Sequence, residues 1–180
     1  MLHQQEIGSS TNRLSFLVPQ VGREISLRFE KLSDFQEELA TSSSTLLKGK
    51  PPTYQLGANI IEVLAHDGVA VVYTSLEDMK AIRKHVYLLP YKGGYYGYTL
   101  LSQEVCDSFL ASYHTTPFQP GFVLANDDQV LSVKGYGYLW IHPHSSASKR
   151  AYLYSTYEDM ALEERLVREF MAKCNEWDRS

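Results

Sequence analysis

Two ten-residue stretches of this chain spell nearly the same junction between a strand and a helix, and this echo restricts the fold more than any other feature. AVVYTSLEDM covers residues 70–79, and AYLYSTYEDM covers residues 151–160. Each runs from an apolar strand to a Ser or Thr that can cap a helix, followed by Glu-Asp in the first helical turn. A second pair, FLVPQVG at residues 16–22 and YLLPYKG at residues 87–93, occurs in the same order.

Two interpretations of the echo stay open. Short matches of this kind arise by chance, because strand-to-helix junctions favour Ser, Thr and acidic residues in any protein. Two matches in the same order, offset by 81 residues (70 to 151) and 71 residues (16 to 87), favour instead a tandem duplication of a hairpin–helix unit. The related halves would then cover about residues 14–85 and 86–177 of a single compact domain, residues 1–180.

Hairpin patterns alternate with short amphipathic stretches along the chain, which predicts an α+β fold of antiparallel β-hairpins with about four helices. The first three helices are expected over residues 32–42, 75–85 and 102–114. TSSSTLLKGKPPT, residues 41–53, is interpreted as a linker-like loop. The fourth helix is expected to begin at Thr156 as N-cap. Its apolar stripe, which we expect to pack on a sheet, comprises Leu166, Val167, Phe170, Met171, Cys174 and Trp177.

The balance of charge argues against one class of partner. With 17 Lys and Arg against 21 Asp and Glu, the net charge is −4, whereas nucleic-acid binders draw affinity from basic residues that neutralise phosphates. No stretch approaches the roughly 18–20 apolar residues needed to span a bilayer, and no secretory signal is visible. Cys106 and Cys174 fall on helical stripes, which favours free thiols. We therefore expect a cytoplasmic protein without membrane contact.

The stretch KGYGYLWI, residues 134–141, resembles the RNA-contacting strand of an RRM domain at every position except the last. As one continuous strand it would place four side chains on one face, namely Lys134, Tyr136, Tyr138 and Trp140. Its glycines would point toward a core. The rest of an RRM is missing, because the partner strand is incomplete and no helix follows directly. Single-stranded RNA binding through this strand is therefore kept as an alternative function.

Tyrosine is unusually frequent, with 13 residues, and it suits both half-buried strands and recognition surfaces. Tyr96 and Tyr98 share a face of a second Gly/Tyr strand, residues 92–101. In one sheet the two strands would form a broad aromatic surface that either packs under the protein's own helix or binds a partner. The leading prediction is a non-catalytic protein-interaction module of the adaptor, inhibitor or immunity-binder type. Its predicted binding residues for a partner protein are Tyr96, Tyr98, Lys134, Tyr136, Tyr138 and Trp140.

His142 and His144 form the most metal-like feature, because residues two apart in an extended segment face the same side. A zinc site needs at least three protein ligands. The spacing singles out no third ligand among the available candidates, which are His66, Asp67, Asp127 and Asp128. A surface loop explains the pair more simply. With no nucleophile elbow, phosphate loop or metalloprotease motif, we predict no catalytic residue and no cofactor. A metal-dependent or small-molecule-binding enzyme using His142 and His144 is kept as a second alternative.

Residues 68–128 also resemble the N-terminal domain of SseB-type ("enhanced serine sensitivity") proteins. That family commonly shows an apolar strand ending in Phe-Thr-Ser and a later strand running into Asn-Pro-Gly. Here Tyr73-Thr74-Ser75 stands for the first motif and Ala125-Asn126-Asp127 for the second. Tyr replaces Phe, and Asp127-Asp128 replaces Pro-Gly. The resemblance implies an α+β fold and a non-enzymatic role, and it assigns no functional residue.

Overall fold

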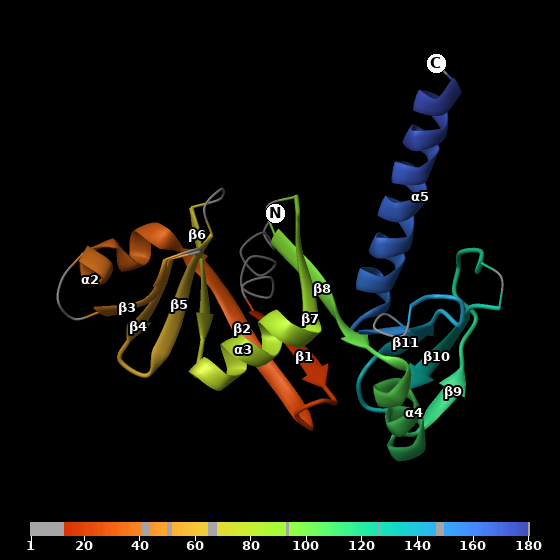
Figure 1. The fold of residues 1–180 in the computed structure, drawn as a ribbon, viewed down its shortest axis with the longest axis horizontal. Coiled ribbons are helices and arrows are strands. Elements are labelled where there is room, and N and C mark those ends of the chain that lie inside the picture. The colour runs from red at the N-terminus through yellow and green to blue at the C-terminus, as the bar shows by residue number, and fades with distance from the viewer. Residues whose placement is uncertain are drawn as a thin grey trace, which may run out of the picture. The chain divides into compact units, whose positions relative to one another are not determined.

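The chain divides into two compact units in the computed structural model, Met1–Tyr96 and Gly97–Ser180 (Figure 1). We refer to them as unit 1 and unit 2, and each is described by itself. The structure describes residues 13–40, 44–49, 52–64, 68–92, 94–125, 127–146 and 150–179. Helices and antiparallel sheets form both units, which confirms the predicted α+β class.

Within the described residues, the first sheet has six antiparallel strands in the order β1-β2-β6-β5-β4-β3. A 3-10 turn, Leu32–Phe35, leads into helix α2 (Gln36–Ala40), and helix α3 (Leu76–His85) follows the last strand. As predicted, Ser75 caps α3, since its hydroxyl accepts a hydrogen bond from the Asp78 amide at 3.1 Å. The strands are β1 (Arg13–Val18), β2 (Arg23–Lys31), β3 (Ser44–Gly49), β4 (Pro52–Leu56), β5 (Asn59–Leu64) and β6 (Val69–Tyr73).

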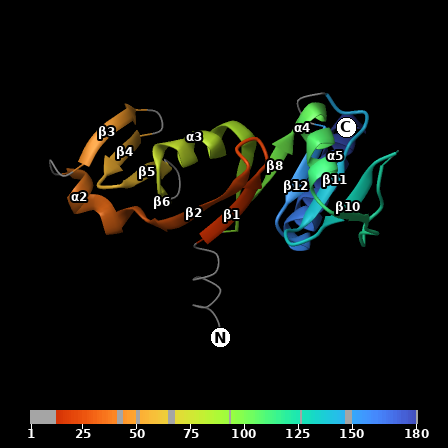
Figure 2. The same cartoon turned by 90° about the horizontal axis from the view of Figure 1, so that it is seen from below.

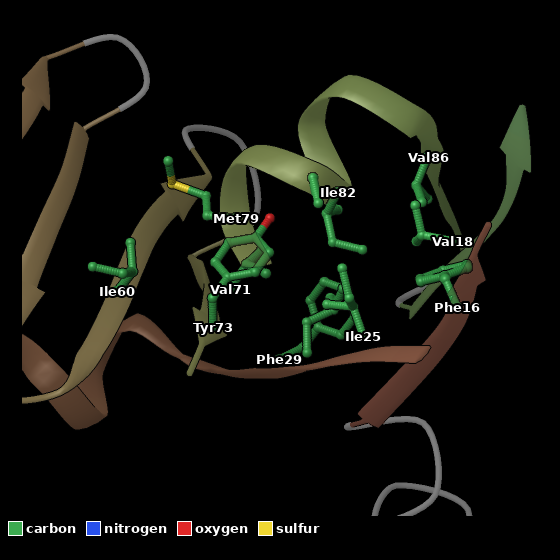
Figure 3. Packing of buried hydrophobic residues seen from close by; sticks show 12 residues of the cluster. Phe16, Val18, Ile25, Phe29, Ile60, Val71, Tyr73, Met79, Ile82 and Val86 are labelled. Atoms are coloured by element: carbon green, nitrogen blue, oxygen red, sulfur yellow. The ribbon is translucent and has the colours of Figure 1, made fainter. Parts of the chain in front are cut away.

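The main core of unit 1 lies between α3 and one face of this sheet (Figures 2 and 3). Met79 and Ile82 of α3 point toward strand residues that include Ile25, Val71 and Tyr73, and none of the five is more than 5% exposed. Successive strand residues point to opposite faces, so the alternate residues cover the other side. There the packed residues are Ile61, Ala70, Val72, Leu32, Phe35 and Leu56.

Within residues 41–53, β3 forms the edge of this sheet, so the prediction of a linker-like loop was wrong for the residues that the structure describes. β3 covers Ser44–Gly49 and pairs antiparallel with β4, with a bulge between Leu46 and Lys48. An edge strand that faces water needs no alternation of apolar residues, and this is why its pattern looked like a loop. Leu46 is 59% exposed. Residues 41–43, 50 and 51 lie outside the described part.

The second sheet also has six antiparallel strands in the part of the chain that the structure describes, in the order β7-β8-β12-β11-β10-β9. Helix α4 (Gln103–Ser112) follows the first hairpin, and helix α5 (Tyr157–Arg179) follows the last strand. No helix among the described residues is long and apolar enough to cross a membrane. The strands are β7 (Val86–Tyr91), β8 (Gly94–Leu101), β9 (Thr115–Pro117), β10 (Gln129–Val133), β11 (Tyr138–Ile141) and β12 (Ala151–Tyr154).

The two sheets repeat one arrangement. Adding six to each strand number of the first sheet gives the order of the second, and each sheet runs as a hairpin, a helix, four strands and a helix. The registers agree as well, because Ile60 lies opposite Tyr73 as Tyr138 lies opposite Tyr154. This duplicated arrangement is consistent with tandem units, as the echo of residues 70–79 in 151–160 predicts.

Candidate functional site

KGYGYLWI is a turn followed by a short strand, so the prediction of one continuous two-faced strand was wrong. β10 ends at Val133 and β11 begins at Tyr138. Between them the Val133 amide donates to the Gly137 carbonyl oxygen at 2.7 Å, and Gly135 has a φ of +80°. Glycine adopts this left-handed conformation without the strain that a Cβ brings. Lys134 and Tyr136 therefore belong to the turn and do not share the strand face of Tyr138.

Five aromatic side chains lie together on one face of the second sheet, and we call this set the aromatic face. Tyr138 and Trp140 of β11 lie opposite Tyr154 and Tyr152 of β12. The ring of Tyr98, on β8, lies 4.8 Å from Tyr152 and 5.0 Å from Tyr154. The structure thus brings Tyr98 together with Tyr138 and Trp140, as the sequence predicted for two tyrosine strands in one sheet.

Helix α5 covers the aromatic face. Met160 of α5 is fully buried, and the Tyr98 hydroxyl donates to Glu163 Oε2 at 3.3 Å. Two phenylalanines after β9 close the face further, with Phe118 4.8 Å from Tyr138 and Phe122 5.1 Å from Trp140, measured between ring centroids. The question that the sequence left open is answered for this face, because it meets the protein's own helix.

The predicted binding residues differ in their exposure. Tyr96, Tyr98 and Trp140 are 5%, 3% and 8% exposed, so their side chains lie inside the units. Lys134 is exposed, and Tyr136 and Tyr138 are half-buried. The partner-binding role of the six residues stays a prediction. Sequence reasoning missed Tyr152 and Tyr154 as members of the aromatic face, although the period of two in AYLYS was the signal for them.

His142 extends the aromatic face at the end of β11 and pairs with a carboxylate. Its Nδ1 lies 3.0 Å from Asp128 Oδ2, and the Trp140 indole donates to the same oxygen at 3.2 Å. Burial lowers the pKa of His142 and outweighs the opposite effects of Asp128 and Glu163. His142 is therefore a neutral imidazole at pH 7. Its buried Nε2 has no hydrogen-bond partner among the described residues.

His144 takes a different carboxylate, so the two histidines do not converge. Its Nε2 lies 3.1 Å from Asp127 Oδ2, and both side chains are exposed. Across the described residues, no group of three or more His, Cys, Asp and Glu could hold a metal ion. The other candidate ligands, His66 and Asp67, lie outside that part of the chain.

Neither cysteine forms a disulfide, as the sequence predicted. Cys106 of α4 is buried, and burial together with the nearby Asp107 raises the pKa of its thiol to about 11. A thiol of this kind stays protonated at neutral pH and is a poor nucleophile. Cys106 is therefore a packing residue on the buried side of α4 rather than a reactive group.

The C-terminal part of α5 carries an exposed apolar face, so the prediction that its stripe packs on a sheet was wrong for this part. We define the α5 stripe as Val167, Phe170, Met171, Cys174 and Trp177. Of these, Val167, Phe170, Met171 and Trp177 are 49%, 59%, 54% and 66% exposed. Figure 1 shows α5 continuing beyond the sheet of its own unit to the C-terminus.

The difference in length between α3 and α5 explains why the α5 stripe extends beyond the sheet. α3 has 10 residues and α5 has 23. With Met79 matched to Met160, the last residue of α3 corresponds to Leu166. Residues 167–179 are thus an extension that a helix in this position does not need in order to cover its sheet. The unequal helix lengths were the sequence signal for this surface.

No family model, curated protein or solved structure matches this chain. The resemblance of residues 68–128 to SseB-type domains stays a prediction.

Proposed function

We propose that this chain is a non-catalytic, cytoplasmic protein-interaction module that docks a partner protein through the α5 stripe. The observation that carries the proposal is the set of four large apolar side chains, each about half or more exposed, on one helix. Contiguous exposed apolar surface of this kind is characteristic of protein-binding sites. An adaptor, an inhibitor or an immunity-type binder would use such a surface.

The spacing of the α5 stripe suits recognition by a helix face. Positions 167, 170, 171, 174 and 177 follow the i, i+3, i+4, i+7 pattern of a helix that docks its apolar face. Two ion pairs join charged residues of the same helix at i, i+4 spacing. Arg168 Nε lies 3.0 Å from Glu164 Oε2, and Arg165 lies 3.9 Å from Glu169. Neither ion pair involves a residue of the α5 stripe.

The aromatic face supports this surface instead of acting as one. Its members are largely buried beneath the first turns of α5, where the Tyr98 hydroxyl donates to Glu163 and the Tyr157 ring lies 5.9 Å from that of Tyr138. Buried aromatic packing of this kind fixes the direction in which the rest of α5 leaves the sheet. The proposal thus places docking on the α5 stripe and positioning on the tyrosines.

The test replaces one anchor of the stripe and one charged residue on another side of the same helix. Phe170→Ser removes an anchor, and Glu169→Ser is the matched control. Both proteins are used to isolate partners from extracts of the native host, and a recovered protein is then purified and its dissociation constant measured by calorimetry. We expect Phe170→Ser to weaken binding at least tenfold, as loss of an aromatic anchor does, and Glu169→Ser to leave it unchanged.

Far-ultraviolet circular dichroism confirms that both variants keep their helices. Equal binding of a recovered partner by wild type and Phe170→Ser would contradict the proposal. The proposal would also be contradicted if the wild type recovered no protein at all, neither a different protein nor a second copy of this chain.

A further inference from the structure

We infer that the partner of the α5 stripe is a second copy of this chain, packed with its α5 helix parallel and in register. This inference rests on the proposed role of α5 as a docking surface and goes on to name the partner. Three features of residues 167–178 carry it, namely the spacing of the apolar residues, the placement of two charges beside them, and the small area that they offer.

The apolar residues follow the spacing of a two-stranded coiled coil. Val167, Phe170, Cys174 and Trp177 are separated by 3, 4 and 3 residues, as positions a, d, a and d of a heptad are. In a parallel pair in register, each of these side chains packs against the same residue of the partner. Val167 places a β-branched residue at position a, as two-stranded parallel coiled coils commonly do.

The charges beside the α5 stripe select the parallel orientation. Lys173 stands at position g, and Asp178 stands at position e of the next heptad, five residues later. In a parallel pair these positions meet across the interface, so Lys173 lies beside Asp178 of the partner subunit, and the pair occurs twice about the two-fold axis. An antiparallel pair would instead set position g beside position g, so that Lys173 meets Lys173 of the partner subunit and two like charges come together.

The area of the α5 stripe indicates a weak dimer. Eleven residues of helix, 167–177, span about 16 Å. With about 150–250 Å² for a fully covered aromatic side chain, the partly exposed residues of the stripe offer roughly 400 Å² on each copy. A standard interface uses about 800 Å² on each partner. The dimer should therefore dissociate in the micromolar range and exchange with monomer on dilution.

Sedimentation velocity on the purified full chain, from about 1 to 200 µM, measures the association. The wild type should shift from monomer to dimer across this range, and Phe170→Ser should stay monomeric. Lys173→Asp should weaken the dimer several-fold, because it sets two acids beside each other on both sides. The double variant Lys173→Asp/Asp178→Lys should restore it. A control with Glu169→Ser should behave as the wild type.

Cys174 reports the register through a disulfide. Diamide takes two electrons and two protons from a pair of thiols, which become a disulfide while diamide becomes the hydrazine. A parallel pair in register places Cys174 beside Cys174 of the partner subunit, so wild type and Cys106→Ser should give a covalent dimer. Cys174→Ser should not.

Each outcome decides the inference. A chain that stays monomeric at 200 µM and gives no covalent dimer overturns it, and the proposed function survives if Phe170→Ser still loses a different protein. A dimer that Phe170→Ser leaves intact overturns the inference, because the two copies then associate through another surface. The parallel register is overturned if the wild type dimerises but two results fail. The double variant Lys173→Asp/Asp178→Lys does not restore the dimer, and diamide does not cross-link Cys174.

Discussion

In unit 2, the turn before β11 passes close to the end of β12. A Cβ added at Gly137 would lie 2.1 Å from the Tyr154 carbonyl oxygen and 2.7 Å from the Ser155 carbonyl oxygen. Both are backbone atoms, so neither can rotate aside as a side chain does. The substitution Gly137→Ala must therefore push β11 and β12 apart where Tyr138 and Tyr154 pair.

The cost of Gly137→Ala follows from this geometry. Overpacking typically costs about 1–3 kcal/mol, and two rigid backbone neighbours place this case near 3 kcal/mol. At roughly 4–8 °C per kcal/mol for a domain of this size, unit 2 would melt about 12–24 °C lower. The matched control is Gly135→Ala. A Cβ added at Gly135 would have open space around it, and the residue has a φ of +80°. Its positive φ alone costs about 1–2 kcal/mol.

Urea titration followed by tryptophan fluorescence measures both variants. Trp140 is 8% exposed inside unit 2, so its emission reports the loss of this core. We expect Gly137→Ala to unfold at a clearly lower urea concentration than Gly135→Ala. Equal midpoints would show that the close approach at Gly137 costs no more than the positive φ of Gly135, and the expected cost near 3 kcal/mol would then be refuted.

Three further predictions concern charged groups. Glu62→Gln removes the charge that pairs with Arg83, whose guanidinium nitrogen lies 3.0 Å from Glu62 Oε2, and both side chains are largely buried. Urea titration should show that the free energy of unfolding falls by about 1–3 kcal/mol. Although burial opposes the charge of Asp78, hydrogen bonds led by that of Arg23 hold its pKa below the ordinary value. Its contribution to stability is present above about pH 4 and is lost as the pH falls through the folded pKa, so wild type and Asp78→Asn should converge in acid. Burial lowers the pKa of His142, so the wild type should lose stability below about pH 6.5, and His142→Gln should lose less over the same interval.

The helix starts were predictable because they depend on neighbours in the chain. The hydroxyls of Ser75 and Thr156 each accept a hydrogen bond from the amide three residues later, at 3.1 Å in both cases. A cap needs only a short polar side chain before an amphipathic run. For the same reason the two strand-to-helix junctions favoured a duplication, one of the two interpretations that the sequence left open, and the order of the strands in the two sheets is consistent with it.

The turn in KGYGYLWI could not be predicted from the alternation of aromatic residues along the sequence. The period of two in Tyr136, Tyr138 and Trp140 continues across residues that do not lie in one strand. The positive φ of Gly135, the hydrogen bond from the Val133 amide to Gly137 and the close approach at Gly137 separate the turn from the strand, and all three depend on backbone geometry. A glycine in such a pattern is compatible with a strand as well as with a turn.

The sequence also could not predict which charged residue of another strand pairs with a given carboxylate. Asp78 and Asp159 occupy the same place in the two matched stretches, yet burial raises the pKa of Asp159 to about 6, while the pKa of Asp78 is lowered. The difference follows from Arg23, which pairs with Asp78. Its counterpart in the match of FLVPQVG with YLLPYKG is Gly94, which carries no charge.

The strand order has a consequence for how each sheet can assemble. β6 pairs with β2 on one side and β5 on the other, and β12 likewise pairs with β8 and β11. The last strand made in each repeat is therefore the one that joins an early hairpin to a later meander. During synthesis these two pieces have no ladder between them until residue 73 or residue 154 has left the ribosome. Each sheet must close in a late step that depends on contacts distant in the chain, which sets the pace of folding.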